Sequence, residues 1–294
     1  MMNRGNDRTE TLNGIMDREI EKNPHSRGLI DAFRPVIIER NRLLDEIAPV
    51  KIDFSTFDKI RFQGGVPLIR QQNLFPPDDP LKEMADRMVP AMKEGFPGLR
   101  DDLDRLQEAW KKGRLVLDDY FRAFPDHGDA VIDRWAADLH AKPQGFALMM
   151  HQLSRIVLEK RAQDAADRIK GIDWTKGFCP ICGSFPSIAL IEEKIPRRWL
   201  HCSRCGYDWL FSRVICPYCE NEAQQGMDFF YVENRAQEAA FSCEKCKRYL
   251  ITLNRVSDLH AHDLDVSAIS LAHLDVIMQG KGFTPMTVCE WNSF

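Results

Sequence analysis

The chain has 294 residues, of which 44% are hydrophobic and 29% are charged, and its formal net charge is −4. This length predicts about two domains, and the slightly acidic balance argues against a dedicated nucleic-acid binder or a membrane-surface protein. No apolar run approaches the ~18 residues of a membrane span, and the first residues lack the apolar core of a signal peptide. The composition therefore predicts a soluble, cytoplasmic protein.

The first part of the chain predicts helices. Pro35 interrupts the earliest apolar pattern, so that helix is expected to start late or to bend there. The glycine pair in the segment 62–68 (FQGGVPL) predicts a turn, because a phosphate loop would need a lysine and a following helix. The amphipathic segments that carry the helical spacing are 26–49, 79–94, 99–110, 126–140 and 144–170.

From residue 178 onward the pattern changes to short runs rich in aromatic and β-branched residues, which predict strands. These runs lie between four Cys-x-x-Cys doublets, and a final amphipathic helix is expected after residue 262. The fold class predicted is α+β, with a helical domain (1–174), two ribbon modules (175–215 and 216–258) and a C-terminal helix with its tail (259–294). The runs that predict strands are 187–193, 197–202, 207–215, 228–234, 238–243 and 248–256.

Cysteine is concentrated in one part of the chain. Eight of the nine cysteines lie between Cys179 and Cys246, and none occurs in the first 178 residues. In a reducing compartment such doublets indicate metal binding far more often than disulfides. The gaps between successive doublets are 19, 10 and 23 residues, which is the pattern of two tandem hairpin units of the same design.

Two cysteines separated by two residues can direct both sulfurs to one ion, and a second doublet on a neighbouring hairpin completes a tetrahedron. Four thiolates suit zinc or a mononuclear iron. Two mononuclear ions are therefore expected. The predicted ligands are Cys179, Cys182, Cys202 and Cys205 for the first ion and Cys216, Cys219, Cys243 and Cys246 for the second.

The residue after each doublet distinguishes the two predicted sites. Gly183 and Gly206 follow the doublets of the first quartet and can adopt a left-handed conformation at little cost. Glu220 and Lys247 occupy the same positions in the second quartet. The second site is therefore expected to hold its ion more weakly.

Several alternatives remain open at this point. The inner two doublets could share one ion in a crossed pairing, or the cysteines could hold an iron–sulfur cluster. His201, which adjoins Cys202, could be a ligand or a neighbour of one. His260, His262 and Cys289 are expected to be ordinary residues. No nucleophile, base or carboxylate pair forms a recognisable catalytic set, so the sequence predicts a protein that is not an enzyme.

The segments CPICGSFP, RRWLHCSRCGYDW, CPYCE, CEKCKRYL and HDLDVSAISLAHLDVIMQGKGF resemble the formate dehydrogenase accessory proteins of the FdhE family. The resemblance is specific over residues 178–284 and general before them. It implies a cytoplasmic protein that assists maturation of respiratory formate dehydrogenase and binds its catalytic subunit before export. It also implies a rubredoxin-like region that holds iron through the four doublets. The resemblance leaves the oligomeric state undefined.

Two other classes of function fit four cysteine doublets: a zinc-ribbon nucleic-acid binder and a rubredoxin-like electron carrier. Residues 178–258 contain ten Lys or Arg and ten Asp or Glu. Two four-thiolate sites with divalent ions would add about four negative charges, whereas a phosphate-binding surface is normally basic. An electron carrier would not require so long a helical region in front. The accessory role is therefore the interpretation that the sequence favours.

Overall fold

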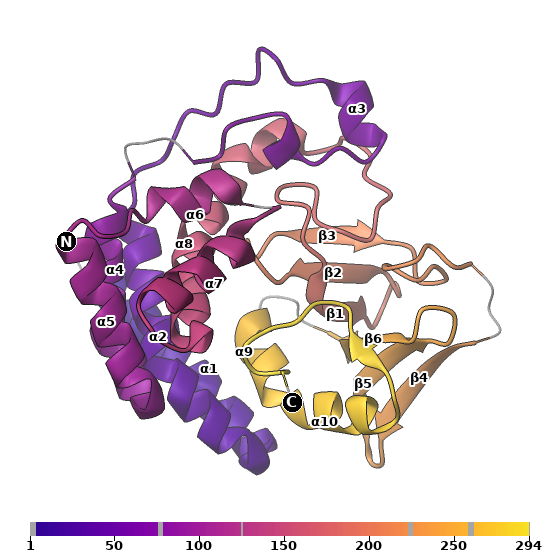
Figure 1. Ribbon diagram of the computed structural model, residues 1–294. Coiled ribbons are helices and arrows are strands. Elements are labelled where there is room, and N and C mark those ends of the chain that lie inside the picture. The colour runs from indigo at the N-terminus through magenta and orange to yellow at the C-terminus, as the bar shows by residue number, and fades with distance from the viewer. Residues whose placement is uncertain (1–3, 76–78, 125, 223–225, 258–261, 294) are drawn as a thin grey trace. The chain divides into compact units, whose positions relative to one another are not determined.

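The computed structural model describes residues 4–75, 79–124, 126–222, 226–257 and 262–293 (Figure 1). These residues form two compact units, each built from segments that are separate in the sequence. Three helices, α1, α2 and α8, contribute residues to both units. The division into four domains by residue number stays a prediction. The first unit consists of 1–13, 31–52 and 73–164, and the second of 14–30, 53–72 and 165–294.

The described part of the first unit is helical, as the sequence predicted. Helix α2 begins well before Pro35 and includes it, so the proline does not delay the start of the helix. The long apolar segment predicted at 144–170 is one helix, α8. None of the described helices is both long and apolar enough to cross a membrane. The helices up to this point are α1 (Arg4–Lys22), α2 (Arg27–Glu46), α3 (Lys59–Gln63), α4 (Leu81–Gly95), α5 (Arg100–Lys111), α6 (Asp118–Ala123), α7 (Gly128–Asp138) and α8 (Pro143–Ile169), with short 3₁₀ turns at Pro24–Ser26, Leu68–Arg70 and Pro97–Leu99.

The core of the first unit contains large apolar side chains such as Trp110 and Phe146, together with buried arginines, of which Arg161 is the least exposed. The Arg161 side chain is 0% exposed, forms an ion pair with Asp79 and donates a hydrogen bond to the carbonyl of Leu74 (3.3 Å). A buried charge is tolerated only when it is paired and hydrogen-bonded in this way. The arginine thus ties α8 to the segment that precedes α4.

The second unit contains one seven-stranded sheet, in which the strand order is β3-β2-β1-β6-β5-β4 and β7 pairs with β6. Neighbouring strands within β1–β3 and within β4–β6 are antiparallel, so each predicted ribbon module is a three-stranded meander. The modules join through a parallel pairing of β1 with β6, which the sequence did not predict. The strands are β1 (Pro186–Glu192), β2 (Arg198–Cys202), β3 (Asp208–Phe211), β4 (Met227–Val232), β5 (Arg235–Cys243), β6 (Arg248–Val256) and β7 (Thr284–Pro285).

The burial of the strands explains this order. All residues of β1 except the last are buried, and β6 has five consecutive buried residues. A strand that is covered on both faces is a continuous apolar run, which suits the centre of a sheet. Strand β3 instead alternates exposed and buried residues, and β4 has no buried residue, so both suit the edges.

The C-terminal segment forms two helices, α9 (Leu264–Ser270) and α10 (Ala272–Gly280), rather than the single helix that was predicted. Leu271 leaves the helical conformation (φ −96°, ψ 13°) and separates them. Helix α9 contacts β1, and α10 contacts β5 and β6. The pairing of Ser270 Oγ with Glu19 Oε2 (3.0 Å) fastens the end of α9 to the second half of α1.

Candidate metal centres

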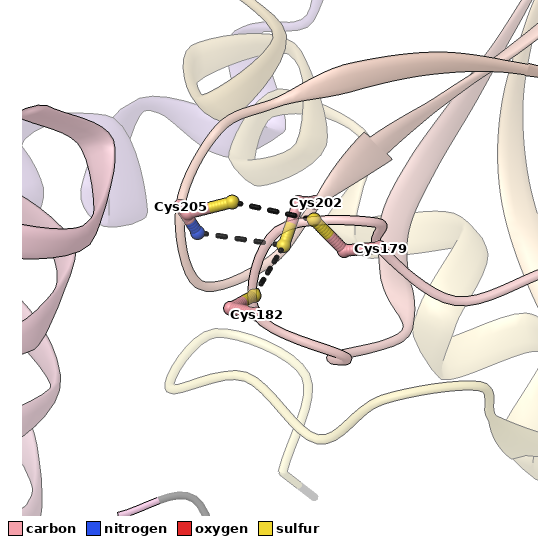
Figure 2. Close-up of side chains that lie close together, drawn as sticks. All are labelled: Cys179, Cys182, Cys202 and Cys205. Carbon is pink, nitrogen blue, oxygen red and sulfur yellow. Dashed lines mark hydrogen bonds between the residues drawn. The ribbon is translucent and has the colours of Figure 1, made fainter. Parts of the chain in front are cut away.

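The first quartet lies where two chain turns meet beside the sheet. Figure 2 shows the sulfurs of Cys179, Cys182, Cys202 and Cys205 gathered in one place. Sγ of Cys179 is 3.4 Å from Sγ of Cys205, and Sγ of Cys182 is 3.4 Å from Sγ of Cys202. At most 2% of any of the four residues is exposed. The site is therefore closed to solvent.

The second quartet has the same arrangement with more exposure. Sγ of Cys216 is 3.8 Å from Sγ of Cys246, and the same distance separates Sγ of Cys219 from Sγ of Cys243. Cys219 and Cys246 are half-buried, whereas the other two are buried. The structure therefore groups the cysteines in the sequential quartets predicted from their spacing, and the crossed pairing is not adopted.

The four turns that carry the doublets share one backbone conformation. In each turn the residue after the doublet donates its N–H to the carbonyl of the doublet's first cysteine, at 2.8–3.2 Å. That residue also has a positive φ: 79° at Gly183, 64° at Gly206, 54° at Glu220 and 55° at Lys247. The left-handed conformation assigned to the glycines is thus present at the two other positions as well. There it costs roughly 1–2 kcal/mol per residue.

Backbone N–H groups point at the sulfurs. In the first site Ile181 N donates to Cys179 Sγ (3.4 Å), and the N–H groups of Arg204 and Cys205 donate to Cys202 Sγ (both 3.4 Å). Burial acts to raise the pKa of Cys202, but hydrogen bonds from the neighbouring thiols and from the Cys205 N–H bring this pKa well below its ordinary value. Such donors stabilise a thiolate at that position.

Several of the other thiols resist ionisation. Burial raises the pKa of both Cys179 and Cys205 well above the usual range. Burial also raises the pKa of Cys216, although the Cys219 and Tyr218 N–H groups oppose the shift. Four thiolates in one closed site therefore need a cation to compensate their charge.

The geometry fits such a cation. Sulfurs about 2.3 Å from a tetrahedral ion lie about 3.8 Å apart, which matches the 3.8 Å pairs of the second quartet and lies near the 3.4 Å pairs of the first. Each quartet could hold one metal ion. With four protein ligands such a site has no open coordination position, so the arrangement suits a structural or electron-transfer ion rather than a catalytic one.

A segment from the front of the chain contacts the first quartet and supports it. The sequence did not predict this contact. Leu68 N donates to the carbonyl of Pro180 (2.8 Å), and Ile69 N donates to the carbonyl of Ile181 (2.9 Å). The predicted turn in 62–68 is present, with Gly65 at φ 97°. This turn brings the chain against the first cysteine doublet. The two contacts are made by backbone groups, which leave no mark in a sequence pattern.

His201 is a neighbour of the first site and not a ligand. Its Nδ1 lies 2.7 Å from Asp208 Oδ1, and its Nε2 lies 3.2 Å from Asp265 Oδ1, so both ring nitrogens already have partners. Burial alone would lower the pKa of His201, but the two carboxylates raise it to about 10. The protonated ring therefore links β2, which ends at Cys202, to β3 and α9.

The remaining candidates lie outside both quartets. Cys289 is buried, its N–H donates to Asn292 Oδ1 (2.7 Å), and burial raises the pKa of its thiol. It is a packed thiol, as predicted. His262 precedes Asp263, whose side chain caps α9 by accepting from Val266 N. His260 lies outside the described residues.

Comparisons with known proteins find relatives along most of the chain. The family model described as the FdhE central domain matches residues 178–213, which include the first quartet. A protein named FdhE homolog from Aquifex aeolicus is 26% identical over 273 residues, covering 90% of this chain and 88% of its own. The FdhE homolog of Yersinia pestis strain Pestoides F is also 26% identical and covers 84% of this chain and 85% of its own.

A solved structure has the same fold. The crystal structure of the FdhE protein from Pseudomonas aeruginosa superposes with a TM-score of 0.59, covers 92% of each chain and is 18% identical. The resemblance to the FdhE family that the cysteine segments indicated is therefore confirmed, and it extends into the helical part of the chain.

Proposed function

From this resemblance to FdhE proteins, we propose that the chain is an accessory protein that binds the catalytic subunit of a respiratory formate dehydrogenase in the cytoplasm, before export. The observation that carries the proposal is the FdhE central domain at residues 178–213, which coincides with the first cysteine quartet. The chain also covers 88% and 85% of two FdhE homologs, so the similarity is not limited to the cysteine-rich segment.

In this proposal the two quartets hold one mononuclear ion each, iron or zinc. The first would be held by Cys179, Cys182, Cys202 and Cys205, and the second by Cys216, Cys219, Cys243 and Cys246. Two closed four-thiolate sites would cross-link the strands of each meander, which stabilises a small sheet domain. The protein would perform no reaction of its own, and its activity would be binding. Support for this role comes from the donor set, which fills all four positions of a tetrahedral ion.

The experiment that tests the proposal measures metal and partner together. A tagged protein would be purified without oxygen from formate-grown cells, and its metal content and the co-purifying proteins would be determined. We expect about two ions per chain and the formate dehydrogenase catalytic subunit. Variants with a quartet cysteine replaced, such as Cys179→Ser, should lose metal and partner, whereas Cys289→Ser serves as the matched control.

Other results would contradict the proposal. Normal formate-dependent respiration in a strain that lacks the gene would remove the accessory role. Tight binding of DNA or RNA with a steep dependence on salt would favour the zinc-ribbon alternative. Reversible one-electron reduction of both sites, without any bound subunit, would favour an electron carrier.

A further inference from the structure

A cavity of about 910 Å³ lies in the second unit, and its wall includes Ile215, the residue that precedes Cys216 of the second quartet. Phe211 from β3 and Phe229 from β4 both line it, although these strands are the opposite edges of the sheet. The sheet therefore curls so that its two meanders face one another across this cavity. Most of the remaining wall is apolar and includes Trp174, Leu210 and Val214. The residues Leu210 and Val214 are 43% and 56% exposed, so the cavity is open to solvent.

The polar feature of the cavity is the buried guanidinium of Arg198, the first residue of β2. This residue is 2% exposed, and its Cζ lies 5.1 Å from the ring centre of Phe211 and 5.4 Å from that of Phe241. Its Nη2 donates to the carbonyls of Ser212 and of Ile215 (2.6 Å to the latter). Its Nε and Nη1 are buried and have no hydrogen-bond acceptor among the described residues. A buried charged donor without an acceptor is costly, which points to an acceptor that arrives from outside.

The charged side chains among the described lining residues are all arginines. Arg197 and Arg213 line it with Arg198, and none of the described lining residues is a carboxylate. Arg197 is paired with Glu192 (3.0 Å), whereas Arg213 donates only to the carbonyl of Pro196 (3.2 Å) among the described residues. A concave site with several cations occurs here in a chain whose net charge is −4. Such a site attracts an acidic group.

We propose that this cavity is a docking site for an acidic segment of a partner polypeptide, with a carboxylate side chain on Arg198 and neighbouring apolar side chains on Trp174, Phe211 and Val214. The aromatic and aliphatic walls require an apolar body beside the charge, which a peptide segment supplies and a free inorganic anion lacks. The inference deepens the proposed function, and it rests on that function only for the identity of the partner.

Arg198 also has a structural role that the test must separate from binding. Its contacts with the carbonyls of Ser212 and Ile215 hold the segment between β3 and Cys216, the first ligand of the second quartet. Loss of Arg198 could therefore disturb that quartet. Arg213 is exposed and has no such contacts, so its replacement tests the charge of the cavity without this complication.

The first probe is a pentapeptide with blocked termini, in which leucine or phenylalanine alternates with two glutamates. The control peptide has two glutamines in place of the glutamates. Binding would be followed through the NMR signal of the Trp174 indole N–H, assigned by its loss in Trp174→Phe. We expect a saturable shift with the glutamate peptide and binding at least about tenfold weaker with the glutamine peptide. Arg198→Lys, Arg198→Gln and Arg213→Gln should each weaken binding, with metal content unchanged in Arg213→Gln.

Arg134→Gln is the matched control, because Arg134 is an exposed arginine in the other unit and should leave peptide binding unchanged. Equal affinity for the two peptides, or no saturable shift with the glutamate peptide, would overturn the proposal. A competition experiment with inorganic phosphate is a further test. If phosphate shifts the Trp174 signal and displaces the glutamate peptide more strongly than the glutamine peptide does, the cavity is a phosphate site and the proposal is wrong.

The second probe is the formate dehydrogenase catalytic subunit itself. Co-purification should be lost in Arg213→Glu and retained in Arg134→Glu. If Arg213→Glu still retains the subunit, the proposal that the cavity is the docking site is wrong. If even the unaltered chain captures no subunit, the proposed function fails instead, and the peptide titration still decides whether the cavity binds carboxylates.

Discussion

Lys176 Nζ lies 2.8 Å from Glu220 Oε1, which joins the chain just before the first quartet to a strained corner of the second. Glu220 has a φ of 54° and is the residue that closes the turn of Cys216 and Cys219. Next to Lys176, a Cβ at Gly177 would lie 1.9 Å from the carbonyl oxygen of Pro217, so the two turns touch at a point that only glycine allows. The segment before the first quartet is thus packed directly on the first doublet turn of the second.

Replacing Glu220 by glycine should strengthen the second metal site. Glycine removes a left-handed strain of roughly 1–2 kcal/mol. The lost ion pair costs less, because the Glu220 side chain is 53% exposed and exposed pairs contribute about 0.2–1 kcal/mol. We expect a chelator to release metal from Glu220→Gly several-fold more slowly than from the unaltered protein. The measurement is the rate of metal transfer to a coloured chelator.

Lys176→Ala is the matched control for that change, because it removes the same ion pair and keeps the strained glutamate. It should release metal slightly faster than the unaltered protein. If Glu220→Gly also releases metal faster, the side chain of Glu220 matters more than its backbone conformation.

The two quartets should empty in a fixed order, the second before the first. Cys219 and Cys246 are half-buried, whereas all four cysteines of the first quartet are buried. The second quartet also carries left-handed Glu220 and Lys247 where the first has glycines. Metal release from variants that retain only one quartet would establish the order. Equal rates, or faster loss from the first quartet, would show that neither exposure nor the strained turns control metal retention.

Alanine at Gly183 should weaken the first site. This glycine has a φ of 79°, and a Cβ there would lie 3.3 Å from Pro67 Cγ in the segment that supports the first doublet. Gly171 has nearly the same φ, 77°, and a Cβ there would meet no atom within 4 Å. Gly171→Ala therefore has the same backbone strain without the contact. We expect faster metal release from Gly183→Ala only, and equal release from both variants would contradict the role of Pro67.

Much of the metal-binding part could be predicted from sequence because its signals are local. Doublet spacing placed Cys179 and Cys205 in one cluster, and β-branched runs placed the strands beside them. The turn conformation at Glu220 follows from the same local logic, since it copies that of Gly183.

The rest depends on contacts between distant segments. The parallel pairing of β1 with β6 joins Ile188 to Ile251 through backbone groups that every residue has. The hydrogen bond from Leu68 N to the carbonyl of Pro180 likewise leaves no pattern in the sequence. In the sequence Arg198 is one of two adjacent arginines and gives no sign of burial. It is buried only because the sheet curls. Contacts between distant segments leave no local pattern in a single sequence, so they could not be predicted from it.

The stability of the second unit should fall as pH rises from about 4 to 7, because of Asp275 on α10. Burial raises the pKa of this carboxyl from 3.8 to about 7, although the hydrogen bond from Tyr249 (2.7 Å) opposes the shift. The folded state therefore binds more protons than the unfolded state within this window. Stability from this group is present below the unfolded pKa and is lost as pH rises through the folded one.

Asp275→Asn should abolish this dependence. At low pH the variant should be about as stable as the unaltered protein, because asparagine resembles the protonated carboxyl. Near neutral pH and above, it should be more stable, by up to about 4 kcal/mol for a shift of about three units. Urea unfolding at several pH values, with metal in excess, measures the difference. Asp228→Asn, at an exposed carboxylate on β4, is the control and should leave the profile unchanged. A pH profile for Asp275→Asn that parallels the unaltered one would show that Asp275 ionises in the folded protein without cost.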